Sequence, residues 1–198
     1  MKKLILAVAC SASFLAQGGS YDIPLKANTY YLIADQLFNT PDNTLPNAIP
    51  APPDGTLFEK YRGGYSAYVF DELIPGWTPD ASAVTLNPGE GGFIKSPVAT
   101  TLTFVGVVPI GSFSLTMPKG AYAVVSAMGP VSATPTALDF PAEDGDIIET
   151  YNNGAFSAYV YDVLTPGWVP SEPTFAVGQA FFVKKSSVAT SLTWTHTY

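Results

Sequence analysis

The sequence has a single cysteine, Cys10, and a single histidine, His196, among its 198 residues. A zinc site built from Cys and His, or a disulfide framework, needs several such residues, so one chain can form neither. A Ser-His-Asp site would have to use a histidine two residues from the end of the sequence. The sequence therefore points away from these classes of enzyme and metalloprotein.

Charged residues are also scarce, at 13% of the chain, whereas hydrophobic residues make up 47%. Intrinsically disordered chains show the opposite balance. The 9 basic and 16 acidic residues give a net charge of −7, which is the wrong sign for a surface that reads phosphates. With 17 Gly and 18 Pro, we expect a folded, loop-rich chain that does not bind nucleic acid.

Residues 1–18 have the pattern of a secretory signal peptide. Lys2 and Lys3 precede a short apolar run, and the small-residue site Ala16-Gln17-Gly18 follows it. The apolar run is far shorter than the roughly 20 residues that cross a bilayer. We therefore expect a secreted protein, extracellular or at the cell surface, with no transmembrane span.

Cleavage near Gly18 would remove Lys2, Lys3 and Cys10, which leaves no cysteine and a net charge of 7 − 16 = −9. The alternative is a lipoprotein anchored through Cys10, because residues 7–10 (AVAC) loosely resemble a lipobox. We favour cleavage, because the apolar run before Cys10 is unusually short for a lipoprotein leader. Without disulfides, the mature protein depends on packing for its stability.

The strongest signal in the chain is an internal repeat. Residues 65–77 (YSAYVFDELIPGW) return as residues 156–168 (FSAYVYDVLTPGW) at an offset of 91, and flanking pieces such as GEGGFIK and GQAFFVK recur in the same order. Chance does not produce such a match, so the mature chain consists of two copies of a unit of about 90 residues. We predict units at 19–108 and 109–198, joined by a short apolar segment that leaves little hinge freedom.

Within each unit the pattern is strand and turn. Apolar and β-branched residues alternate with period two at 101–108 and 192–198, and Pro-Gly and Asp-Gly turns separate such runs. We predict an all-β fold with two homologous β-sandwich or barrel-like units in tandem and pseudo-twofold symmetry. The strand at 65–72 has apolar side chains on both faces, which predicts that it is covered on both sides.

Trp77 and Trp168 follow Pro-Gly turns at equivalent positions, with Tyr68 and Tyr159 on the preceding strands. One interpretation is a sugar-stacking platform in each unit, because an amphipathic ring can stack on a sugar while its polar edge stays wet. The other, which we favour, places each Trp in the core of its own unit, because aromatic rings dominate burial in small domains.

An acidic cluster of Glu143, Asp144, Asp146 and Glu149 surrounds a glycine turn, and oxygen-rich loops of this kind can hold Ca²⁺. Asp144 and Asp146 are the best candidate ligands. The spacing does not match the twelve-residue calcium loop, and the first copy lacks most of these charges. We favour a solvated turn and expect no metal or other cofactor.

Four carboxylates could be nominated for glycoside hydrolysis, namely those of Asp71, Glu72, Glu90 and Asp162. Asp71 and Asp162 match across the copies and precede the Pro-Gly-Trp turns, which favours hydrogen bonding within the turn. No catalytic constellation is visible, so we expect a protein that is not an enzyme.

The chain ends at Tyr198 inside a run with strong β-propensity. We favour an ordinary closing strand of the second unit. The alternative is a free edge that pairs with a neighbouring molecule and joins subunits into a fibre or layer.

Four pieces of the first copy, LIADQL at 32–37, DGT at 54–56, TLNPGEGGF at 85–93 and LTFVG at 102–106, resemble a repeat of uncharacterised secreted proteins from verrucomicrobial and planctomycete-type bacteria. The resemblance implies secretion and a duplicated β-rich fold, but it implies no activity and no site residue. The second copy departs from the pattern around Gln179, so a function that depends on Glu90 need not be shared.

From these observations we expect a secreted, non-enzymatic structural or interaction protein of the cell exterior, self-assembling through edge strands. The second hypothesis is a glycan partner, held by a carbohydrate-binding module that uses Trp77 and Trp168. The third is a hydrolase based on carboxylates.

Overall fold

The computed structural model describes residues 17–74 and 76–198. The leader predicted for residues 1–18, including Cys10, lies outside these residues except for its last two positions. The strands are β1 (Gly18–Leu25), β2 (Tyr30–Ile33), β3 (Leu57–Tyr61), β4 (Tyr65–Asp71), β5 (Gly76–Thr78), β6 (Gly92–Lys95), β7 (Thr100–Val107), β8 (Ser112–Thr116), β9 (Tyr122–Ser126), β10 (Ile147–Asn152), β11 (Ala155–Asp162), β12 (Gly167–Val169), β13 (Ala180–Lys184) and β14 (Thr193–Thr197). One short helix, α1 (Leu45–Ala48), and one 3₁₀ turn, η1 (Thr136–Leu138), complete the described part, so the predicted all-β class is confirmed.

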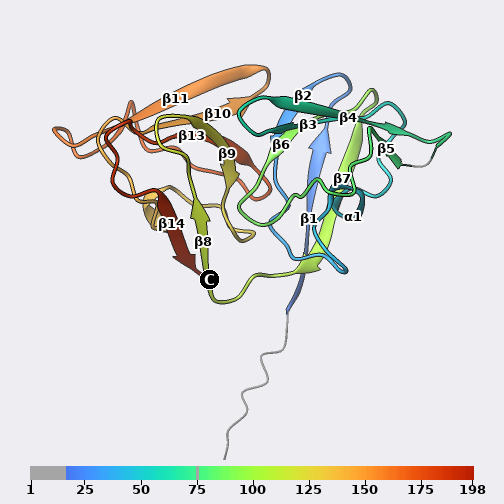
Figure 1. Cartoon of the computed structure of the whole chain (residues 1–198), viewed down its shortest axis with the longest axis horizontal. Helices are drawn as coiled ribbons and strands as arrows, with labels where there is room; N and C mark the ends of the chain where they lie inside the picture. The colour runs from blue at the N-terminus through green and yellow to red at the C-terminus, as the bar shows by residue number, and fades with distance from the viewer. Residues whose placement is uncertain (1–16, 75) are drawn as a thin grey trace, which may run out of the picture.

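The strands form two five-stranded sheets and two two-stranded ribbons (Figure 1). The first sheet has the order β2-β6-β3-β4-β5, and the second has the order β9-β13-β10-β11-β12. These orders are the same when strands are matched by the sequence repeat. β1 pairs with β7 in one ribbon, and β8 pairs with β14 in the other. The structure is thus consistent with two similar β units, a first unit of β1–β7 and a second of β8–β14.

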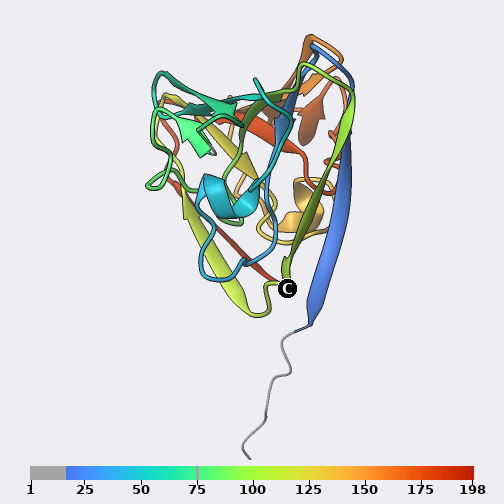
Figure 2. The ribbon, with the colours of Figure 1, turned by 90° about the vertical axis from the view of Figure 1, so that its right-hand side faces the viewer.

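Each sheet packs one face against the ribbon of its own unit (Figures 1 and 2). In the first unit, Phe58 and Ile94 of the sheet share a buried cluster with Leu102 and Phe104 of β7. In the second unit, the equivalent cluster joins sheet residues such as Phe181 to Trp194 of β14. The main core of each unit thus lies on one side of its sheet, and a smaller buried cluster of Leu32, Ala34, Phe93, Ala180 and Phe182 lies on the other side, where the two units meet.

The expectation that the strand at 65–72 is covered on both sides was wrong. Phe70 of β4 points into the core, but Ala67 and Val69 are exposed, and Val69 keeps 41% of its surface accessible. The apolar residues on the outer side of β4 fit the β-propensity of a strand, but no layer of the described residues 17–74 and 76–198 packs over them. The same holds for β11, where Val160 is also 41% exposed.

The two units meet through reciprocal contacts. Ala34 N donates to Gly178 O at 2.9 Å, and the equivalent Ser126 N donates to Gly89 O at 3.0 Å. Each unit therefore inserts the loop before its β6 or β13 strand into the other. Gly178 requires its lack of side chain, because its φ is +74° and a Cβ there would lie 2.7 Å from side-chain atoms of Tyr21 and Ile23.

A close approach lies at the centre of this junction. A Cβ built on Gly91 would overlap the Cβ of Ala180 and would lie 3.0 Å from both Ile33 O and Val124 Cγ1. Gly91 and Ala180 occupy equivalent positions in the two copies. The junction thus has room for the Cβ of Ala180 but not for a second Cβ at position 91.

A buried carboxyl lies in the loop after β2. Asp35 accepts hydrogen bonds from Leu37 N at 3.0 Å and from the side-chain amides of Asn39 and Asn43 at 2.8 and 3.2 Å. Burial raises the pKa of Asp35 to about 6, against the lowering effect of these three donors. The carboxyl is thus protonated more readily in the folded than in the unfolded chain.

This shift predicts a pH-dependent stability. The folded state binds the extra proton between the unfolded value of 3.8 and about 6, so this group's contribution falls as the pH rises through that window. Between pH 7 and pH 4, the wild type should gain about 2 kcal/mol of stability relative to Asp35→Asn. Asn39 Oδ1 is buried without a partner among the described residues, so a turned Asn39 amide can accept from the new Asn. Urea unfolding of both proteins across this range measures the difference, and a difference that does not change with pH would contradict the prediction.

Candidate functional site

The outer faces of the two sheets carry an unusual set of side chains because their strands alternate. In β3, Phe58 and Lys60 are buried, whereas Leu57, Glu59 and Tyr61 are half-buried on the outer side. β10 repeats this pattern, with Glu149 and Tyr151 at the outer positions. The outer side of these two strands is thus only partly exposed and carries aromatic as well as charged side chains.

Eight aromatic rings gather there in four equivalent pairs, and we call them the aromatic face. The pairs are Tyr30 with Tyr122, Tyr61 with Tyr151, Tyr65 with Phe156, and Phe93 with Phe182.

Contacts between the rings cross the junction in both directions. Phe93 lies 5.0 Å from Tyr151 between ring centroids, and the equivalent Phe182 lies 5.8 Å from Tyr61. Phe93 and Phe182 themselves lie 6.0 Å apart. The aromatic face is therefore built from both units, and its two outermost rings remain accessible, with Tyr65 53% and Phe156 52% exposed.

Two shallow hollows open on the aromatic face. One, of about 230 Å³, is lined by Tyr30, Glu59, Tyr65, Phe93, Tyr151 and Phe156. The other, of about 250 Å³, is lined by Tyr61, Tyr65, Tyr122, Glu149, Phe156 and Phe182. The second list is the first one with every residue replaced by its equivalent in the other copy. The molecule therefore presents the same kind of hollow twice, each with one carboxylate among aromatic rings.

Charged groups lie beside the rings. Lys95 Nζ lies 4.9 Å from the centroid of the Tyr30 ring, and the equivalent Lys184 Nζ lies 5.4 Å from that of Tyr122. Tyr122 donates to Glu149 Oε1 at 2.9 Å, and burial together with this carboxylate raises the pKa of Tyr122. Each hollow thus combines apolar ring faces with hydrogen-bonding groups at their edges.

The tryptophans nominated from the sequence lie elsewhere. Trp77 and Trp168 are each only 6% exposed and belong to the cores, and Trp77 Nε1 donates to Ile49 O at 3.2 Å. Tyr68 and Tyr159 are half-buried and pack against the same cores. Buried rings offer no face to a sugar, so the stacking platform predicted on these four residues is corrected by the structure.

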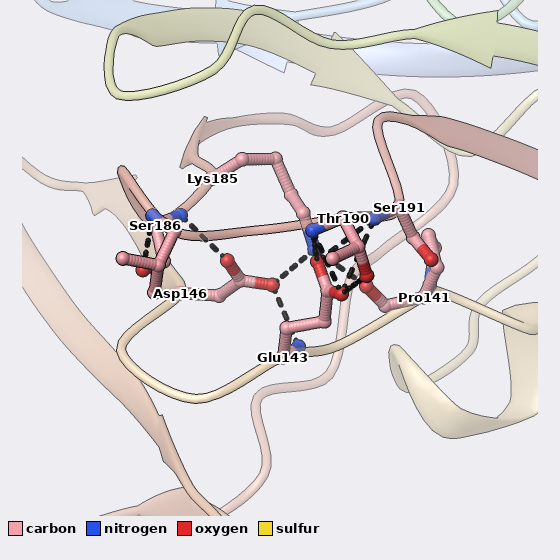
Figure 3. Close-up of polar contacts among 8 residues, drawn as sticks. Pro141, Glu143, Asp146, Lys185, Ser186, Thr190 and Ser191 are labelled. Carbon is pink, nitrogen blue, oxygen red and sulfur yellow. Dashed lines mark hydrogen bonds and ion pairs between the residues drawn. The ribbon is translucent and has the colours of Figure 1, made fainter.

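The carboxylates of the acidic cluster are bound by groups of the protein itself. Asp146 and Lys185 form an ion pair in which both side chains are fully buried, and Asp146 Oδ1 accepts from Ser186 N at 2.7 Å (Figure 3). Asp144 accepts from Val163 N at 3.2 Å. The two candidate Ca²⁺ ligands are thus engaged by protein donors, and in residues 17–74 and 76–198 no three His, Cys, Asp or Glu side chains are grouped as a metal would need.

Glu143 fixes a neighbouring segment. It accepts from Thr190 N and Ser191 N, from the Thr190 hydroxyl, and pairs with Lys185 Nζ at 3.4 Å (Figure 3). The hydrogen bond from the Thr190 hydroxyl is the largest cause that lowers the pKa of Glu143, to about 2. This network ties the turn before β10 to the turn after β13. Glu149, the fourth member of the sequence cluster, lies on the aromatic face instead.

The other nominated carboxylates serve turns. Asp71 and Asp162 accept from Leu73 N and Leu164 N, each at 2.8 Å, as the sequence favoured. Glu90 accepts from Asn87 N at 2.9 Å. Glu72, in the turn after β4, is exposed.

The strand before Tyr198 pairs with β8 of its own chain, as favoured from the sequence. His196, on that strand, lies 2.8 Å from Asp139 Oδ2 through its Nδ1.

The aromatic face was missed by the sequence analysis. Its members flank the quoted repeat, and Tyr61 and Glu59 match Tyr151 and Glu149 at an offset of 90, one residue less than the offset of the quoted repeat. Comparing the outward positions of the strands in both copies would have found it.

Comparisons with protein-family models, with curated proteins and with solved structures found no match to this chain. Among the described residues, no helix has the length and apolar character needed to cross a bilayer.

Proposed function

We propose that this protein is a secreted, non-enzymatic interaction protein that holds a glycan chain against the aromatic face. The observation that carries the proposal is the pair of equivalent hollows, each lined by aromatic rings from both units with a carboxylate between them. Rings of Tyr and Phe stack on the apolar faces of sugars. At the sugar edges, tyrosine hydroxyls donate or accept hydrogen bonds and carboxylates accept them.

The size of the hollows supports a sugar rather than a whole small molecule. At about 230 and 250 Å³, both are smaller than the ~300–1,000 Å³ of pockets that enclose drug-sized ligands. They are open, and they lie side by side because both are lined by Tyr65 and Phe156. This arrangement fits two sugar residues of a longer chain that continues beyond the hollows.

A second copy of the protein fits the same face less well. The centres of protein interfaces are depleted of charged residues, whereas Glu59, Glu149, Lys95 and Lys184 all lie among these rings. The net charge of −7 also opposes close association of identical chains.

Assembly through the edges of the two five-stranded sheets has little support. At the edges nearest the junction, β2 and β9 bridge to the other unit through Ile33 and Val125. At the opposite edges, β5 and β12 have three residues each. Strands this short offer few free backbone groups for pairing with another chain.

The test removes the two exposed rings. Tyr65→Ala with Phe156→Ala should weaken binding to a panel of neutral polysaccharides (cellulose, xylan and a β-1,3-glucan) by about five- to 150-fold, since two stacking rings contribute about 1–3 kcal/mol. Val69→Ala with Val160→Ala is the matched control, because these residues are exposed on the same strands outside the hollows. Affinity electrophoresis and pull-down measure binding, and circular dichroism checks the fold.

Two results would refute the proposal. One is that the wild type binds none of these polysaccharides, or that the valine control loses as much binding as Tyr65→Ala with Phe156→Ala does. The other is a concentration-dependent dimer in sedimentation velocity that Tyr65→Ala with Phe156→Ala dissolves, which would assign the face to a second copy. Release of new reducing ends from the bound polysaccharide would contradict the non-enzymatic part of the proposal.

A further inference from the structure

A larger cleft lies beside the aromatic face, and the proposed function does not use it. It has a volume of about 420 Å³ and is lined by residues of both units, including Lys60, Arg62, Glu90 and Val125. Tyr61 and Tyr122 line both this cleft and one hollow of the aromatic face, so the two are adjacent.

The cleft contains a nearly buried lysine. The Lys60 side chain is 6% exposed, its Nζ donates to Thr85 O at 2.8 Å, and Glu90 Oε2 lies 3.5 Å from it. Burial lowers the pKa of Lys60, against the opposite effect of Glu90. An ammonium group has three donors, so one remains for a further acceptor.

Arg62, the only arginine of the sequence, lies two residues further along. Its one side-chain contact among the hydrogen bonds of the described residues is a long one, 3.5 Å from Nη2 to Thr85 Oγ1. Since a guanidinium has five donors, most of them are free for a ligand. Two cationic groups and the single Glu90 carboxylate give this part of the cleft a net charge of +1, in a protein with a net charge of −7.

The second copy supplies an internal control for these charges. The equivalent cleft, of about 210 Å³, is lined by Asn152 and Gln179 at the positions of Arg62 and Glu90, and buried Thr150 stands at the position of Lys60. Gln179 Oε1 accepts from Ala176 N at 3.0 Å, which is the same turn contact that Glu90 makes with Asn87 N. The fold therefore does not require charged side chains at these three positions.

We propose that the cleft binds the carboxylate of an acidic sugar between Lys60 and Arg62. A monovalent anion matches the net charge of +1, and the buried position of Lys60 strengthens its attraction to an anion. The sugar part of this assignment rests on the proposed function, because the cleft shares Tyr61 and Tyr122 with a hollow of the aromatic face. The glycan held by the protein would then contain uronic acid residues, with the carboxylate always on the side of the first unit.

The experiment uses the single arginine as a reporter. Sodium glucuronate is titrated into the ¹⁵N-labelled protein, and the one Arg Nε–H signal is followed by NMR, with glucose, acetate and inorganic phosphate as comparisons at constant ionic strength. Glucuronate should shift the Arg62 signal in a saturable way, and the comparison compounds should do so at least about tenfold more weakly in apparent affinity.

The matched variant is Lys60→Thr with Glu90→Gln, which copies the second unit and leaves the net charge unchanged. It should fold and should lose at least about tenfold in affinity for glucuronate, because the buried cation is gone. Its binding of neutral polysaccharides should remain, since the rings are untouched, whereas Tyr65→Ala with Phe156→Ala should lose that binding. The two proposals can therefore fail separately.

The proposal is overturned if glucuronate does not shift the Arg62 signal or if the variant responds as the wild type does. Equal responses to phosphate or acetate would also overturn it, because the site would then be a general anion site and not one for an acidic sugar.

Discussion

Replacing Gly91 by alanine is expected to destabilise the protein by about 3 kcal/mol, the upper end of what overpacking a core usually costs. The new Cβ would overlap that of Ala180 and would press on Ile33 O and Val124 Cγ1, each 3.0 Å away. The contact with Ile33 is a backbone oxygen and the contact with Ala180 is a Cβ. Neither atom can move away by a change of rotamer, as the end of a long side chain could. Denaturant unfolding followed by tryptophan fluorescence measures the loss.

The equivalent positions provide a sharp control. Ala180→Gly alone should cost only about 1 kcal/mol, the usual effect of a glycine within a strand. In the double variant, which exchanges the two residues, the overlap with position 180 is gone, so the double variant should be more stable than Gly91→Ala alone. A coupling energy near zero in this cycle would show that the two residues do not meet as described.

Replacing Lys185 by methionine is expected to cost about 3–5 kcal/mol, because it leaves the Asp146 carboxylate buried without its cation. Methionine keeps most of the volume of the lysine stem, so the loss reports the charge rather than a cavity. Glu143 N and Ser186 N still donate to Asp146, at 2.8 and 2.7 Å, and they soften the effect without removing it. Thermal and urea unfolding measure the change.

The matched variant is Lys185→Met combined with Asp146→Asn. A neutral amide keeps an acceptor for Ser186 N, so the double variant should recover most of the loss. The first unit has uncharged, buried Thr56 and Ser96 at the corresponding positions, which shows that this fold does not need the pair. If Lys185→Met were as stable as the wild type, the ion pair would not have the burial that the structure gives it.

The parts of the fold that depend on local pattern could be predicted from the sequence. Alternation at 101–108 and 192–198 marked β7 and β14, and the repeat indicated two similar units. The position of Trp77 in a core followed from the tendency of large rings to be buried. Each of these inferences needs only neighbouring residues or a comparison of the two copies.

The remaining features depend on how distant strands meet. The sequence shows that β4 is apolar on both faces, but it does not show that β1 and β7 pack against the same side of the sheet and leave the other side of β4 exposed. Lys60 of β3 pairs with Glu90 of the loop before β6, and Lys185 pairs with Asp146, which lies 39 residues earlier in the sequence. The aromatic face needs both units in place, because Phe93 meets Tyr151 only across the junction.

The close approach of Gly91 and Ala180 bears on how two such units can come to share one chain. In a homodimer of identical single units, both positions would carry the same residue, and alanine in both would overlap. Such a dimer could therefore have only glycine there. Joining the units covalently lets the two sides of the symmetry axis change independently, so one methyl group can be added. Ala180, Lys60 and Lys185 are all departures from symmetry that a homodimer of identical units would not allow. The charge of the cleft, present in one unit and absent from the equivalent positions of the other, is a departure of the same kind.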